Sequence, residues 1–132
     1  MSAIDRVIAC LEICAETLGD ITPLVFERFF AYDVEAAALM QHSDPHMQGR
    51  MMEQTLELLM TDEHFGEGGY LAWELDNHLD AYQATPAMYG AFFRAIGDVL
   101  KIGSGDHWTP VETAAWDERV ALIMQQVHAH GD

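Results

Sequence analysis

The chain has 132 residues, of which 50% are hydrophobic and 10% aromatic, so it is neither disordered nor fibrous and fits one folded domain, residues 1–132. Its 22 acidic residues against 6 basic ones give a net charge of −16, which disfavours binding to nucleic acid or to anionic membrane surfaces. No apolar run reaches the roughly 20 residues of a membrane span, and acidic residues near the start argue against a signal peptide. We therefore expect a soluble, cytoplasmic protein whose acidic surface is either a solubility adaptation or a docking surface for a basic partner.

Prolines mark four predicted helix starts. Each proline follows a residue type that commonly caps helix N-termini, and proline is favoured at the first helical position. The pairs are Thr22-Pro23, Asp44-Pro45, Thr85-Pro86 and Thr109-Pro110, the last continuing to Glu112 as a capping box.

Apolar periodicity supplies the helix bodies and shows no alternating strand pattern. The fold class is therefore predicted to be all-α, with about seven helices. The predicted helices cover, in chain order, residues 4–18 (ending near Gly19), 23–32, a short turn at 34–40, 45–61, 70–82, 86–101 and 110–128, with loops at 65–69 and 103–108.

The segment 86–101 is apolar on nearly all sides, which predicts a central, buried helix. Gly90 and Gly97 within it are predicted to be points where other helices approach closely. Cys10 and Cys14 are four residues apart in the first helix, where a disulfide would require distorted geometry. They are interpreted as core residues, with a redox pair as the alternative.

One histidine lies on an apolar helix face. In the segment 70–82, the residues Leu71, Leu75, His78, Leu79 and Tyr82 share one side of the predicted helix. A buried histidine can simply find a hydrogen-bond partner, or it can bind a metal through a neutral imidazole nitrogen. The periodicity leaves both interpretations open.

A second helix also carries a single nitrogen-bearing side chain on its apolar stripe. In the segment 45–61 this stripe contains Gln48, Met52, Thr55 and Leu59. The methionines of this segment also suit flexible core filling. His42 and His46 are four residues apart but straddle Asp44-Pro45, and a metal site there would need further ligands.

Four segments in this order and at this spacing resemble a globin, most closely the single-domain bacterial haemoglobins. The distance of 30 residues from Gln48 to His78 suits the family's distal-to-proximal connection. The similar segments are LVFERFFAYDVEAAALM (24–40, B and C helices), MQGRMMEQTL (47–56, E helix), LDNHLDAYQATPAMYGAFF (75–93, F and G helices) and WTPVETAAWDERVALIMQQV (108–127, H helix).

The resemblance implies a globin fold with one haem b (iron protoporphyrin IX) between the E and F helices. It makes His78 the proximal iron ligand and Gln48 the distal hydrogen-bond donor. Met52 becomes the apolar distal neighbour, Phe26 the aromatic residue of the B helix, and Tyr82 a neighbour of a haem propionate. Where the family carries a phenylalanine packed on the porphyrin, this chain has Met40, which fills a similar volume and contacts aromatic rings favourably. That departure leaves open weaker haem retention or a haem-free protein.

The function that this resemblance implies is reversible binding of a diatomic gas (O2, NO or CO) at a five-coordinate iron, because the distal position holds an amide rather than an imidazole. The sequence contains no Cys-x-x-Cys-His motif for covalent haem attachment. Two alternatives remain. One is a haem-dependent NO dioxygenase or peroxidase-like enzyme served by an external flavoprotein reductase, and the other is a haem-free sensor or interaction module with the globin fold.

Overall fold

The structure, a computed structural model, describes residues 2–62 and 85–131, with side chains as far as residue 128. Every regular element in these ranges is a helix, which confirms the all-α prediction. The elements are α1 (Ala3–Leu18), α2 (Thr22–Tyr32), α3 (Val34–Leu39), α4 (Pro45–Met60), α6 (Pro86–Ser104), the 3₁₀ helix η2 (Gly105–His107) and α7 (Pro110–Gly131). None of the helices in the described ranges combines the length and hydropathy that crossing a bilayer requires. The predicted loop 65–69 and helix 70–82 lie outside the described residues.

Two proline-marked helices begin with the predicted cap. The side chain of Asp44 accepts a hydrogen bond from the backbone nitrogen of Met47 at 2.8 Å and so caps α4. Thr85 caps α6 in the same way, accepting from the backbone nitrogen of Met88 at 3.2 Å. Each cap satisfies a backbone N–H that the first turn of a helix leaves without a partner.

The predicted cap at Thr22 is wrong, because α2 begins at that residue and its N-cap is Ile21. The backbone nitrogen of Thr22 donates to Oδ1 of Asp20 at 3.0 Å, so an upstream carboxylate already satisfies the first free N–H of this helix. Pro23 then occupies the second helical position, where it needs no backbone N–H.

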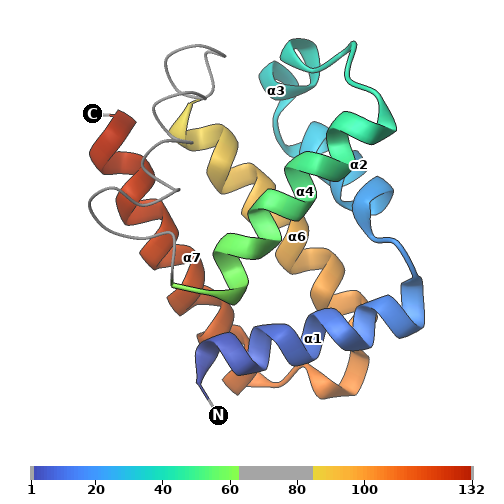
Figure 1. Ribbon diagram of the computed structural model, residues 1–132, viewed down its shortest axis with the longest axis vertical. Coiled ribbons are helices and arrows are strands. Elements are labelled where there is room, and N and C mark those ends of the chain that lie inside the picture. Colours follow the sequence, from blue (N-terminus) through green and yellow to red (C-terminus); the bar gives the residue numbers. More distant parts are fainter. Residues whose placement is uncertain (1, 63–84, 132) are drawn as a thin grey trace.

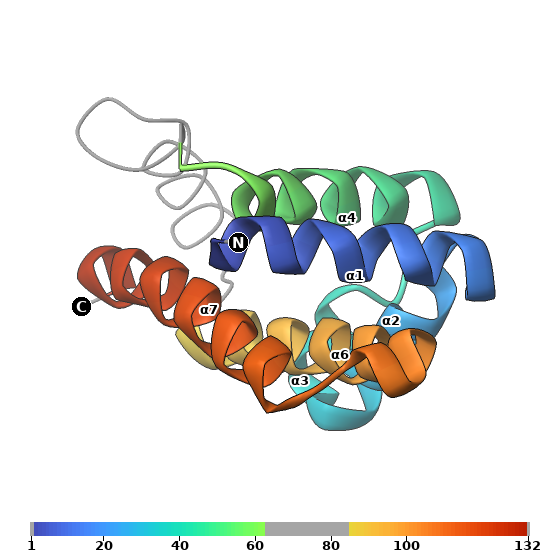
Figure 2. The same ribbon diagram turned by 90° about the horizontal axis from the view of Figure 1, so that it is seen from below.

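Helix α6 is the central element, as its apolar sequence predicts. It packs against α1, α2 and α7, and Figure 1 shows it running through the middle of the bundle. Figure 2 shows α1 and α4 on one side of the molecule and α6 and α7 on the other. The helix ends three residues later than predicted, at Ser104, because Gly105 with φ 54° provides the break and Gly103 still belongs to the last turn. The buried residues of α6 are Met88, Phe92, Phe93, Ala95, Ile96, Val99, Leu100, Gly103 and Ser104.

Glycines on α6 allow neighbouring helices to approach closely at two places. A Cβ atom added to Gly97 would lie 2.7 Å from Nε1 of Trp116 on α7, which confirms the predicted contact. A Cβ added to Gly103 would lie 2.5 Å from Sγ of Cys14 on α1, a contact that the sequence analysis missed. The prediction for Gly90 is wrong, because a Cβ there meets no atom within 4 Å.

Cys10 and Cys14 are free, buried thiols, which confirms that they are core residues without a disulfide. Burial raises the pKa of both thiols. Sγ of Cys14 donates to the carbonyl oxygen of Leu100 at 3.5 Å, and this bond requires the protonated form. Since the thiolate is the reactive species, the surroundings disfavour the redox alternative.

A buried carboxylate ties the beginning of α1 to the beginning of α7. Glu112 is 5% exposed, and its Oε2 lies 2.7 Å from Nη1 of Arg6. Its Oε1 accepts from the backbone nitrogen of Thr109 at 3.1 Å and from the Thr109 hydroxyl, as the predicted capping box requires. The Thr109 hydrogen bonds, together with the Arg6 guanidinium, lower the pKa of Glu112 to about 2.

Gly97→Ala should destabilise the protein, whereas Gly90→Ala should stabilise it. Alanine is the better helix former by about 1 kcal/mol at either position. Only at position 97 must the added methyl group displace an indole ring, and overpacking of this kind costs roughly 1–3 kcal/mol. Denaturant unfolding of the two variants measures the difference, and equal free energies of unfolding would contradict the close contact of α6 with α7.

Glu112→Gln should flatten the dependence of stability on pH between about 4.5 and about 2. Above this window the carboxylate is ionised in both folded and unfolded chains, and its stabilisation of the fold is complete. As pH falls through the window the unfolded chain takes up the proton first, so the wild type loses stability and the variant loses less. Glu118→Gln, at an exposed side chain of the same helix, is the matched control. Parallel curves for wild type and Glu112→Gln in acid unfolding would contradict this assignment.

Candidate functional site

An aromatic cluster fixes Phe26, the predicted aromatic residue of the distal pocket. The spacing of Phe26, Phe29 and Phe30 puts all three rings on one side of α2, where they pack against each other. Phe92 of α6 completes the cluster, with ring centroids 5.3 Å from Phe26 and 5.0 Å from Phe29. Phe26 is only 2% exposed. Edge-to-face packing of this kind gives the Phe26 ring a defined position in the core.

The apolar stripe of α4 faces the interior as predicted. Met52 and Leu59 are buried in the same core cluster as Phe26, while Gln48 and Thr55 are half-buried. The Thr55 hydroxyl donates to the carbonyl oxygen of its own helix one turn back. The stripe therefore presents one side-chain amide, that of Gln48, near the N-terminal end of an otherwise apolar face.

Met40 ends the short helix that precedes α4. It is the C-cap of α3, and its backbone nitrogen donates to the carbonyl oxygen of Ala36 at 3.0 Å. Its side chain is half-buried and packs against the core cluster that contains Phe26 and Met52. The structure thus brings together three of the six predicted site residues in one apolar region.

Gln48 lies in the first turns of α4, beside the connection from Met40. Its backbone nitrogen donates to the carbonyl oxygen of Asp44 at 3.0 Å. Its side-chain Nε2 donates to Oγ of Ser43 at 3.0 Å. The sequence analysis did not select Ser43, because a serine in a connection gives no periodic signal. The remaining predicted site residues, His78 and Tyr82, lie outside the described residues.

A buried arginine on α7 fixes the other end of α4. Arg119 is 2% exposed, and its Nη2 donates to the carbonyl oxygens of Leu58 at 2.7 Å and Thr61 at 3.3 Å. Its Nη1 lies 2.5 Å from Oδ1 of Asp62. A positive charge at the carboxyl end of a helix satisfies free carbonyl groups and interacts favourably with the helix dipole. Arg119 therefore anchors the helix that carries Gln48 and Met52.

The described site residues Phe26, Met40, Gln48 and Met52 are all uncharged. An apolar wall with one amide donor suits the flat, apolar face of a porphyrin and a small, weakly polar ligand beside it. A nucleophile paired with a general base is absent from these four residues. In the described part of the chain, no three His, Cys, Asp or Glu side chains gather as a metal site, and His42 and His46 are both exposed.

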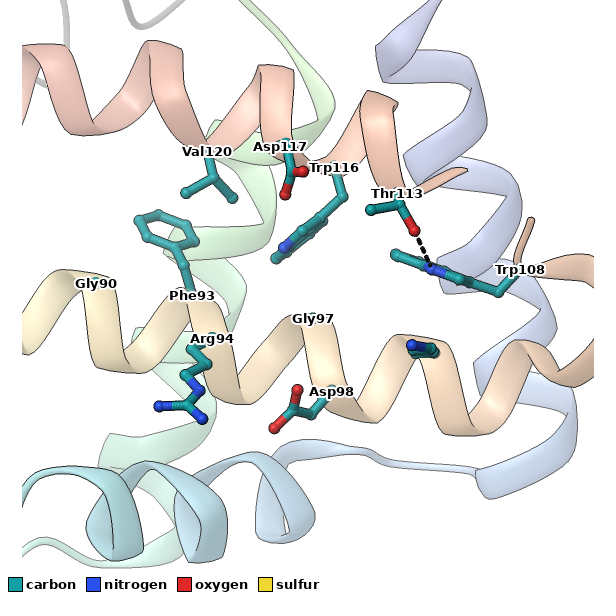
Figure 3. Close-up of a pocket in the computed structure, with 11 residues that line it drawn as sticks. Gly90, Phe93, Arg94, Gly97, Asp98, Trp108, Thr113, Trp116, Asp117 and Val120 are labelled. Carbon is teal, nitrogen blue, oxygen red and sulfur yellow. Dashed lines mark hydrogen bonds between the residues drawn. The ribbon is translucent and has the colours of Figure 1, made fainter. Parts of the chain in front are cut away.

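A separate groove of about 340 Å³ lies between α6 and α7 and contains none of the predicted site residues. Figure 3 shows the Trp116 indole ring between the two helices, and Nε1 of Trp108 donating to Oγ1 of Thr113, at 2.9 Å. The groove is an open surface feature with both acidic and basic side chains. Its lining residues are Gly90, Phe93, Arg94, Gly97, Asp98, Lys101, Trp108, Thr113, Trp116, Asp117 and Val120.

Comparison with solved structures identifies the fold. The chain is similar to a crystal structure from Pseudomonas aeruginosa PAO1, a protein described as structurally highly homologous to human haemoglobin. The TM-score is 0.84 at 16% sequence identity, over 98% of this chain and 98% of the other. No family model matches the sequence, and no curated protein matches it. The predicted globin-like fold is thereby confirmed.

Proposed function

We propose that this chain holds one haem b non-covalently and reversibly binds a diatomic gas such as O2, NO or CO. The observation that carries this proposal is the distal wall, on which the buried side chains of Phe26 and Met52 accompany the single half-buried amide of Gln48. A globin-like fold supplies the setting in which such a wall faces a porphyrin. The absence of charge on the wall favours gas binding over acid–base chemistry.

Each site residue then has a distinct part. His78 ligates the iron through a neutral imidazole nitrogen, and Tyr82 lies beside a haem propionate. Phe26, Met40 and Met52 exclude water from the distal side, and Gln48 donates a hydrogen bond to the gas. When bound, the haem supplies an iron coordination position open to a diatomic molecule.

An absorption spectrum of the purified protein tests the proposal directly. After reconstitution with haem, we expect one haem per chain, an intense Soret band, and reversible shifts of that band on reduction with dithionite and on addition of CO. A protein that stays colourless and takes up no haem would contradict the proposal, and would favour the haem-free sensor or interaction module.

His78→Ala should abolish stoichiometric haem binding, or leave a pocket that binds haem only with added imidazole. The reason is that a globin pocket depends on one proximal nitrogen ligand, and His78 is the histidine on the apolar face of the predicted helix 70–82. His46→Ala and His128→Ala remove exposed histidines and serve as controls. If His78→Ala keeps the wild-type spectrum, the iron ligand is a different residue.

Gln48→Leu should speed O2 dissociation roughly threefold to a hundredfold, the range that corresponds to losing one hydrogen bond to a neutral or charged acceptor. CO dissociation should change far less, because CO is the weaker hydrogen-bond acceptor of the two gases in a haem pocket. Gln54→Leu makes the same substitution elsewhere on α4 and is the matched control. Stopped-flow measurement of equal O2 dissociation rates in wild type and Gln48→Leu would assign the stabilising role to another residue.

A further inference from the structure

The amide of Gln48 is held at its tip by a side chain from outside its own helix. Nε2 of Gln48 and Oγ of Ser43 are 3.0 Å apart, in a partly buried position. A glutamine amide carries two N–H donors, and a serine hydroxyl can accept one of them. Ser43 therefore occupies one donor of Gln48 and leaves the second available to a ligand.

Ser43 is itself fixed by the connection between α3 and α4. Its backbone nitrogen donates to the carbonyl oxygen of Met40 at 2.9 Å, which closes the turn that follows α3. The next residue, Asp44, caps α4 and accepts the backbone N–H of Gln48. The turn and the helix cap together set the position of the Ser43 hydroxyl relative to the Gln48 backbone.

Gln48 is thereby restrained at both ends, by its helix at the backbone and by Ser43 at the amide. A free glutamine side chain loses up to about 2 kcal/mol of rotamer entropy when it is fixed. Restraint before the ligand arrives removes part of that cost from ligand binding, because the donor is already in place.

We propose that Ser43 is a positioning residue that holds the Gln48 amide ready to donate its second N–H to the bound gas. This inference rests on the proposed function, since it concerns the same distal site. It adds a residue from the connection between α3 and α4 to the residues that determine O2 affinity.

The test compares Ser43→Thr with Ser43→Val, which have the same shape and differ in the hydroxyl group. In both variants the backbone nitrogen of residue 43 can still donate to Met40. We expect Ser43→Val to speed O2 dissociation roughly two- to tenfold, the factor that one neutral hydrogen bond sets, with CO dissociation unchanged. Ser43→Thr should behave as the wild type. An unchanged or slower O2 dissociation in Ser43→Val overturns the proposal, and the slower rate would mean that Ser43 draws the amide away from the ligand.

A double-mutant cycle separates positioning from a general effect on the fold. In the Gln48→Leu background, Ser43→Val should have no further effect on O2 dissociation, because no amide remains to be held. An equal effect in both backgrounds overturns the proposal.

A readout that does not need haem is the side-chain NH2 signal pair of Gln48 in an ¹⁵N-labelled protein, assigned by its disappearance in Gln48→Leu. This pair should shift in Ser43→Val and stay in place in Ser43→Thr. If the protein takes up no haem, the proposed function fails, and the role of Ser43 in gas binding fails with it. If haem binds but the NH2 pair ignores the Ser43→Val substitution, the proposed function stands and only the inference fails.

Discussion

The contact between the Trp116 indole ring and the backbone of Gly97 sets the spacing of α6 and α7, and the geometry of the candidate site depends on it. Arg119 lies almost one turn beyond Trp116 on α7, so the same spacing determines where its guanidinium reaches the end of α4. The position of α4 in turn fixes Gln48 and Met52. A glycine far from the ligand thus contributes to the shape of the distal wall through three packed helices.

Much of the fold follows from local chemistry that is visible in the sequence. The caps at Asp44 and Thr85 and the capping box at Thr109 depend only on residues within one turn, so their types and spacing suffice to predict them. Thr22 was mispredicted because a carboxylate just upstream competes for the same N–H. Gly90 and Gly103 were misjudged for a different reason, since the crossing points of helices depend on tertiary packing that periodicity does not encode.

The candidate site shows the same division. Phe26 and Met52 could be predicted because apolar residues at helical spacing point to the interior, and both are buried. Ser43 and Arg119 could not, since each acts through a contact made by a connection or by a distant helix. An arginine 57 residues from its carboxylate partner carries no signal in the sequence between them. The polar groups that position a site are therefore harder to predict than the apolar groups that line it.

The ion pair of Arg6 with Glu112 joins residues 106 positions apart, and α1 packs mainly on α6 and α7. During synthesis on the ribosome, the first helix therefore emerges long before the surface that covers its apolar side. Its buried face, which includes Val7, Cys10 and Cys14, stays without those partners until nearly the whole chain has been made. Completion of the bundle is consequently a late, post-translational event, and the nascent chain is most exposed to aggregation and to chaperone binding through its N-terminal helix.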